Sequence, residues 1–192
     1  MHKYLPLLCL AILLFSCQNT QKADGKIVKT DIDREIKMQN TPEKLADYYT
    51  AIFNADQNAR DAATLAQEQY GYNSSEHIAA ERVLSKTDSL NLAKIEKLFA
   101  LHGYPTTDKV GHIGAAAPWT VIHHAGDLGD RLHNWKIIKE GYKIGEIDDN
   151  ALSLYLNRTY EYINNGERLR MQGTFKTKEQ VDSLLTLLEL EL

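Results

Sequence analysis

The chain has 192 residues, of which 43% are hydrophobic and 25% charged, and its formal net charge is −4 with the histidines neutral. A chain of this length can form its own hydrophobic core, because a domain near 150 residues buries about 70% of the surface of its unfolded chain. The mildly acidic balance excludes the basic surface that nucleic-acid binding requires, so we expect no nucleic-acid partner.

The first 16 residues predict a secretory signal. Lys3 provides a short basic start, and residues 5–15 are almost wholly apolar. That run is too short for a transmembrane helix, which needs about 20 apolar residues. The segment Leu14–Cys17 (Leu-Phe-Ser-Cys) has the pattern of a bacterial lipobox, which predicts cleavage before Cys17 and attachment of lipid to it. Residues 1–16 are therefore interpreted as a lipoprotein signal peptide. The alternative is an ordinary signal peptide beside an incidental cysteine.

Lipid attachment predicts a location in the bacterial cell envelope. Cleavage would remove Cys9, and lipid would consume the only other cysteine, so no disulfide or thiol chemistry would remain. We expect contact with the membrane through the lipid anchor at Cys17, and a protein that faces the periplasm rather than the cell surface. Residues 17–40 are polar and predict a tether, and residues 41–192 predict one helical domain.

Two long helices are predicted to open this domain. Thr41-Pro42-Glu43 is a helix start, because threonine can cap, proline suits the first helical position and glutamate complements the helix dipole. Apolar residues then recur every three or four positions from 45 to 53. Ser75 can cap the second helix, in which we expect a break between residues 85 and 89. Gly103 is expected to end it.

The third helix is predicted to pack closely against its neighbours. Residues 111–117 are mostly glycine and alanine, so little side chain separates this helix from others. Pro118 removes a backbone donor and should kink it. Glycines at residues 126–129 allow a corner, and a fourth helix follows with apolar residues at helical spacing until Gly145.

The pattern changes after a fifth helix. Tyr160 and Tyr162 alternate with polar residues, Asn164-Asn165-Gly166 is a turn signal, and apolar and basic residues alternate over 168–171. This arrangement predicts a small β-hairpin. A capping box at Thr177–Gln180 then opens a last helix. The predicted fold class is mainly α, a single helical domain with a small C-terminal β-hairpin.

Short motifs follow one another in a fixed order from Asn54 to Thr174. They are Asp56 and Arg60 as D-x-x-x-R, Asp88 and Asn91 as D-x-x-N, Gly103-Tyr104-Pro105, Val110-Gly111, His124-Ala125, Arg158 and Gly173-Thr174. Together they resemble a bacterial family known only as domain-of-unknown-function family 6624. The resemblance implies a shared fold and no particular reaction. This chain has His123 where the family tends to glutamine, and Asn157 where it tends to aspartate, so a catalytic carboxylate at the second position would be lost.

Five polar residues fall on helix faces that are otherwise predicted to be buried: Arg60, Asp88, Asn91, His124 and Arg158. Buried polar groups must be paired, because each unpaired one costs about 1–3 kcal/mol. One interpretation is an internal network of ion pairs and hydrogen bonds that fixes how the helices pack. The other is a pocket with His124 and Asp88 as catalytic residues and His124 as the acid or base. Arg60, Asn91 and Arg158 would then bind the ligand, with the two arginines holding an anionic group.

The histidines also suggest a metal site as an alternative. His123 and His124 precede Asp127 by four and three residues, so either pair could share one helix face. A zinc site needs at least three converging protein ligands, however, and adjacent residues on a regular helix point about 100° apart. We therefore expect no metal and no cofactor. One of the two histidines is then expected to be exposed and the other to be a hydrogen-bonded core residue.

Two functional hypotheses follow. The first is a membrane-anchored lipoprotein that serves as a helical binding or scaffold module, with a protein or small-molecule partner that the sequence does not identify. The lipobox, the amide at Asn157 and the lack of a recognised catalytic motif favour it. The alternative is a hydrolase-like or ligand-processing enzyme with a His/Asp/Arg pocket, in one version assisted by a metal. The arrangement of the polar side chains decides between them.

Overall fold

The computed structural model describes residues 31–167 and 178–192 and divides the chain into two compact units, Met1–Met38 and Gln39–Leu192. The described part of the first unit is a short helix over residues 31–37. The predicted signal peptide, Cys17 and much of the predicted tether lie outside the described residues. Among the residues that are described, no helix has the length and hydrophobicity needed to cross a bilayer.

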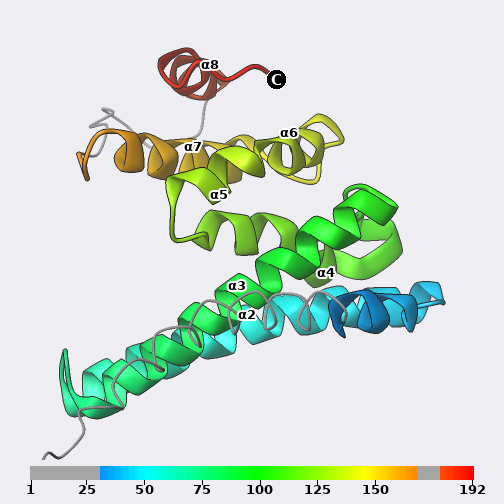
Figure 1. Cartoon of the computed structure of the whole chain (residues 1–192). Coiled ribbons are helices and arrows are strands. Elements are labelled where there is room, and N and C mark those ends of the chain that lie inside the picture. The colour runs from blue at the N-terminus through cyan, green and yellow to red at the C-terminus, as the bar shows by residue number, and fades with distance from the viewer. Residues whose placement is uncertain (1–30, 168–177) are drawn as a thin grey trace, which may run out of the picture. The chain divides into compact units, whose positions relative to one another are not determined.

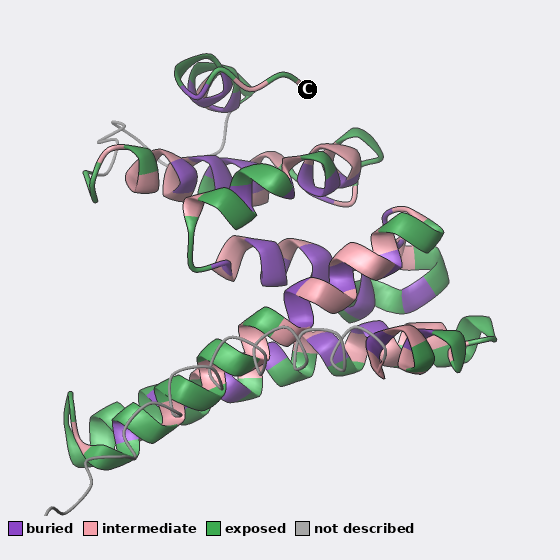
Figure 2. Ribbon diagram, viewed as in Figure 1, coloured by how far each residue is buried: buried purple, intermediate pink, exposed green. Residues whose placement is uncertain are grey.

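A hairpin of two long helices opens the second unit (Figure 1). Helix α2 spans Pro42–Tyr70 and α3 spans Ser75–His102. The side chain of Thr41 caps α2 and Pro42 takes its first position, as predicted. Ser74, not Ser75, caps α3, which runs without interruption through the predicted break at residues 85–89. The turn end of the hairpin is largely exposed (Figure 2).

Helix α4 (Thr107–His124) packs against α2 most extensively and also against α3. The close approach predicted from its small residues occurs at Gly114, where an added Cβ would lie 3.3 Å from the Cβ of Tyr49. The backbone departs from helical geometry at Gly111, with φ of 73°, and not at Pro118. Because α4 ends at His124, it brings both histidines of its last turn to the junction with the helices that follow.

Four shorter helices follow in the described residues of this unit: α5 (Leu128–His133), α6 (Trp135–Lys143), α7 (Asp149–Ile163) and α8 (Lys178–Leu187). The predicted fourth helix is therefore divided in two at Asn134. Helix α7 contacts α4, α5, α6 and α8, and it buries Leu152, Tyr155 and Leu156 completely. The side chain of Asp148 caps α7, so the residues that follow are held in helical register.

The predicted β-hairpin is wrong. Tyr160 and Tyr162 lie in the last turns of α7, and the 164–166 turn ends that helix. Residues 168–171, the second predicted strand, lie outside the described residues. Within the described ranges the structure has helices and turns and no strand, so the fold class is mainly α without the hairpin. The alternation covered too few residues to separate a period of 2 from a period of 3.6.

Candidate functional site

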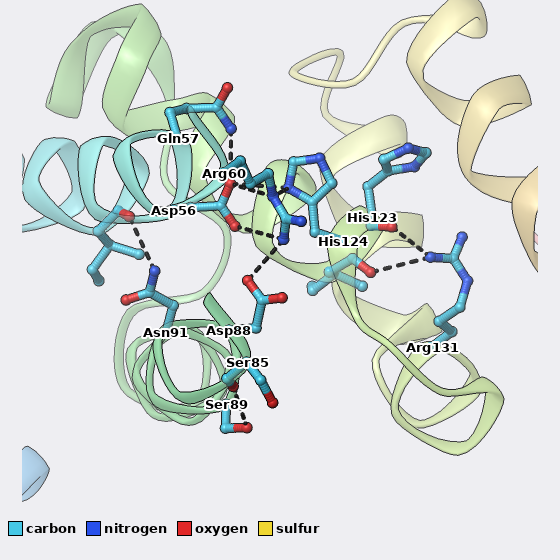
Figure 3. Close-up of polar contacts among 12 residues, drawn as sticks. Asp56, Gln57, Arg60, Ser85, Asp88, Ser89, Asn91, His123, His124 and Arg131 are labelled. Atoms are coloured by element: carbon cyan, nitrogen blue, oxygen red, sulfur yellow. Dashed lines mark hydrogen bonds and ion pairs between the residues drawn. The ribbon is translucent and has the colours of Figure 1, made fainter. Parts of the chain in front are cut away.

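Four polar side chains from three helices meet in one cluster (Figure 3). Asp56 and Arg60 come from α2, Asp88 from α3 and His124 from the end of α4. Arg60 Nη2 donates to Asp88 Oδ1 at 2.7 Å, and Arg60 Nε donates to Asp56 Oδ2 at 3.2 Å. Nδ1 of His124 lies 2.9 Å from the same Asp56 oxygen. The cluster therefore ties α2 to both α3 and α4.

The hydrogen bonds determine which ring nitrogen of His124 carries the proton. Its Nδ1 lies 2.8 Å from Arg60 Nε and 2.9 Å from Asp56 Oδ2, and one nitrogen cannot accept from the first and donate to the second at once. An unprotonated Nδ1 would set its lone pair against an anionic oxygen. We therefore assign the proton to Nδ1, which donates to Asp56. In the neutral ring, Nε2 then keeps its lone pair.

The two carboxylates of the cluster differ in their electrostatics. Asp56 is fully buried and also accepts a hydrogen bond from Gln57 Nε2 at 2.7 Å. Burial raises the pKa of Asp56, but the hydrogen bonds and charges of His124 and Arg60 outweigh burial and hold that pKa below its usual value. The pKa of Asp88 is raised, first by burial and also by the charge of Asp56, against the opposing effect of Arg60. Asp56 is thus the better-paired carboxylate.

Arg60 is poorly suited to the predicted role of binding an anion. The guanidinium of Arg60 already faces two carboxylates, those of Asp56 and Asp88. The cavity beside Arg60 and Asp88, of about 430 Å³, is also lined by acidic residues, namely Glu81, Asp127 and Asp130. An incoming anion would meet this negative potential and would have to displace a 2.7 Å ion pair.

The other two predicted ligand-binding residues lie outside the cluster. Asn91 is buried and its Nδ2 donates to the carbonyl oxygen of Ile52 at 3.3 Å, which joins α3 to α2. Arg158 lies on α7 and forms no hydrogen bond or ion pair within the described residues. The structure therefore brings together three of the five predicted residues, Arg60, Asp88 and His124.

Arg158 instead lines a second cavity, which has a volume of about 730 Å³ and involves the end of α4 and the second half of α7. Two buried atoms of its lining residues, His123 Nδ1 and Asn157 Oδ1, have no hydrogen-bond partner among the residues that the structure describes. We call this space the α4–α7 cavity. Its lining combines basic, amide, acidic, aromatic and aliphatic side chains, among them His123, Leu154, Asn157, Arg158, Glu161 and Tyr162.

His123 has an environment opposite to that of His124. Its ring stacks on Trp119, with centroids 4.7 Å apart and planes 11° apart, and Trp119 Nε1 in turn donates to the carbonyl oxygen of Ala151. Burial, and then the positive charges of Arg131 and Arg158, lower the pKa of His123 to about 3. His123 is therefore a neutral ring at physiological pH.

Arg131 on α5 is a fully buried cation that no carboxylate of the described residues neutralises. Its guanidinium donates to the carbonyl oxygens of His123 and Tyr155, both at 2.7 Å, and to Thr159 Oγ1 at 3.1 Å (Figure 3 shows the contact with His123). It also lies 5.6 Å from the ring centroid of Tyr162. Burial lowers its pKa to about 10, so it stays charged at neutral pH. Arg131 thus fastens the end of α4 to α7.

Four residues of these two sites were not selected from the sequence. Asp56 had a usable signal, because it precedes Arg60 by four residues and the pair shares a helix face. Asn157 was noted only as a departure from the family pattern, and His123 as such a departure and as a possible metal ligand. Arg131 carried no signal, since its neighbour Leu132 was expected on the buried face and is 41% exposed.

The metal alternative gains no geometric support. Within residues 31–167 and 178–192, no three histidine, cysteine, aspartate or glutamate side chains converge in a way that could hold a metal ion. These ranges include the histidines and the aspartate around the end of α4, which are His112, His123, His124, Asp127 and His133.

No family model, no curated protein and no solved structure matches the chain. The resemblance to family 6624 therefore remains a prediction.

Proposed function

We propose that this protein is a lipid-anchored module of the bacterial cell envelope that binds a small ligand in the α4–α7 cavity. One observation carries the proposal. The predicted catalytic groups, His124 and Asp88, are paired with Asp56 and Arg60. By contrast, His123, Asn157 and Arg158, which line a cavity, carry polar groups that have no partner among the described residues. Because about 90% or more of buried polar groups in native proteins are paired, unpaired atoms around a cavity point to a missing partner.

The size and chemistry of the cavity support binding. Its volume of about 730 Å³ falls in the range of small-molecule sites, about 300–1,000 Å³. Leu154 and Tyr162 give the lining an apolar part, and His123, Asn157, Arg158 and Glu161 give it polar groups that can fix the orientation of a ligand. His123, with a pKa of about 3, is unsuited to acid–base catalysis near neutral pH, since that role needs a pKa near the working pH.

Binding is tested by filling the cavity with an indole ring. Leu154 lines the cavity and is 49% exposed, so Leu154→Trp should occlude the space without disturbing the core. The matched control is Leu132→Trp, at a leucine on α5 that is 41% exposed and outside this lining. Native mass spectrometry of protein extracted from membranes should detect a small molecule on the wild type and the control only. Identical spectra for all three proteins would contradict the proposal.

The lipid anchor rests on the Leu14–Cys17 pattern and has its own test. Replacing the nucleophilic thiol by Cys17→Ser removes the atom to which lipid would be attached. We expect the variant to lose labelled palmitate and to leave the membrane fraction, because one or two acyl chains then no longer hold it at the bilayer. Membrane retention equal to that of the wild type would show that the protein is held by something else.

A hydrolase-like or ligand-processing activity is the second candidate, and one observation favours it. A buried carboxylate, Asp56, holds Nδ1 of His124, which leaves Nε2 free to act as a base. The test is to incubate the recovered ligand with the protein and follow its mass. Conversion by the wild type, lost in His124→Ala, would support the enzyme. A ligand that stays unchanged would exclude the activity.

A further inference from the structure

We propose that the ligand of the α4–α7 cavity is a small organic carboxylate with an apolar body, and that Arg158 binds its carboxylate. The proposal rests on the binding function proposed above and specifies the chemistry of the ligand. Four features carry it: the unpaired charge of Arg158, a second cation behind the cavity wall, an apolar part of the lining, and unused hydrogen-bonding groups.

The first feature is the free guanidinium. Arg158 is half-buried and has neither a hydrogen bond nor an ion pair within the described residues. Glu161, the acidic side chain in the same lining, is engaged in an interaction of its own and does not pair with Arg158. The planar fork of an arginine matches the two oxygens of a carboxylate. A carboxylate ligand would therefore supply the counter-charge that Arg158 lacks.

The second feature is the positive charge of Arg131, which lies behind the cavity lining. Arg131 donates to the carbonyl oxygen of His123 and lies 5.6 Å from the ring centroid of Tyr162, and both of these residues line the cavity. The charges of Arg131 and Arg158 both lower the pKa of His123, which places this ring in a positive potential. Two cations, Arg158 in the lining and Arg131 behind it, therefore act on this space against one acidic side chain, Glu161, which favours an anionic ligand.

The third feature distinguishes an organic anion from an inorganic one. Leu154 and the ring of Tyr162 face a space of about 730 Å³, far more than a single phosphate or sulfate would fill. A ligand with an aromatic or alkyl body would cover these apolar surfaces and gain affinity with the area that it buries.

The fourth feature concerns His123 and Asn157. The unpaired Nδ1 and Oδ1 atoms lie on terminal ring and amide groups, whose torsions are broad and roughly two-fold. If rotation about these torsions exposed either atom to the cavity, a hydroxyl or N–H group of the ligand could donate to it. Arg60, by contrast, is already paired with Asp56 and Asp88, and the cavity beside it is lined by further acidic residues.

The test is calorimetric titration of the full-length protein in detergent, at constant ionic strength, with acetate, hexanoate, benzoate, benzamide and inorganic phosphate. We expect hexanoate and benzoate to bind at least about tenfold more tightly than acetate, because they bury more apolar area. Phosphate and the uncharged benzamide should bind at least about tenfold more weakly than benzoate.

Three variants assign the binding to Arg158. Arg158→Gln should weaken benzoate binding at least about tenfold, since a charge-assisted pair is lost, and Arg158→Lys should lie between it and the wild type. Asn157→Asp should also weaken it, because the new carboxylate would compete for the guanidinium. The matched control is Arg82→Gln, an exposed arginine on α3, which should change nothing. Circular dichroism melts establish that each variant is folded.

The outcomes separate this inference from the binding function. Benzoate affinity unchanged in Arg158→Gln, phosphate binding as tight as benzoate binding, or no saturable carboxylate binding to folded wild type would each overturn the inference. Benzamide binding that Leu154→Trp abolishes and Arg158→Gln does not would overturn the inference and leave the binding function intact. Failure of native mass spectrometry to find any bound molecule, together with no titratable ligand, would remove both.

Discussion

Adjacent histidines at the end of α4 show how strongly one helical step changes the chemistry of a side chain. A rotation of about 100° separates His124, which faces Asp56 at 2.9 Å, from His123, which stacks on Trp119. The first has a carboxylate partner, and the second is buried among cations.

The buried neutral ring of His123 predicts a loss of stability in mild acid. Its pKa is about 3 in the folded protein against 6.5 in the unfolded chain, so below pH 6.5 only the unfolded state gains the proton. Between pH 7 and pH 5 the free energy of unfolding should fall by about 2 kcal/mol from this group, with further loss towards pH 3. Urea unfolding at both pH values should show that this difference disappears in His123→Gln.

The control for that prediction is His112→Gln, because His112 is exposed and in the same helix. It should keep the full pH dependence of the wild type. A pH dependence that is the same in His123→Gln as in the wild type would show that His123 is accessible to protons in the folded state.

The two carboxylates that bind Arg60 should contribute unequally to stability. The lowered pKa of Asp56 means that its charge stabilises the fold above the unfolded pKa, and that this stabilisation is lost as the pH falls through the folded pKa. Asp56→Asn should cost about 3–5 kcal/mol at pH 7, as for other broken buried pairs. The raised pKa of Asp88 makes its charge unfavourable on folding, so Asp88→Asn should cost much less. Urea titrations that give the reverse order would contradict this assignment.

Among the secondary-structure elements, α6 has the tightest glycine contact. A Cβ added at Gly141 would lie 2.5 Å from Tyr104 Cε2 and 2.8 Å from Ile147 Cδ1, and both of these side chains are buried. Gly141→Ala should therefore lower stability by about 1–3 kcal/mol, although alanine is the better helix former. Gly126→Ala, with nothing within 4 Å of the added atom, should leave the melting temperature nearly unchanged. If Gly141→Ala melted at the same temperature as the wild type, α6 could shift to accommodate the added methyl group without a loss of stability.

Local chemistry predicted the start of α2, whereas the division of a helix by a tertiary contact could not be predicted. Thr41 caps α2 as expected, because capping depends on one side chain and the nearest N–H groups. The division of the predicted fourth helix at Asn134 depends on a tertiary contact, since Asn134 Nδ2 donates to Glu96 on α3. The predicted hairpin failed for a similar reason: Tyr162 lies beside the buried Arg131, a partner that its neighbours in sequence do not indicate.

At the scale of the whole molecule, only part of the candidate site could be predicted. The meeting of Arg60, Asp88 and His124 followed from the need to pair polar groups on apolar faces. The individual pairings could not be predicted. Asp56 and His124 are 68 residues apart, and their contact depends on how α4 packs against α2. The α4–α7 cavity could not be predicted. Its importance depends on which polar atoms lack a hydrogen-bond partner and on a cation from a third helix, Arg131 on α5, and sequence spacing indicates neither.

The shift in melting temperature caused by benzoate is the most direct test of the account. It distinguishes a structural role of the Arg60–His124 cluster from ligand binding in the α4–α7 cavity. We expect benzoate to raise the melting temperature of the wild type, because a ligand that binds only the folded state stabilises it. That rise should persist in His124→Ala, whose own melting temperature is lower, and should disappear in Arg158→Gln. A rise that disappears in His124→Ala and persists in Arg158→Gln would place the ligand at the acidic cluster and contradict the assignment.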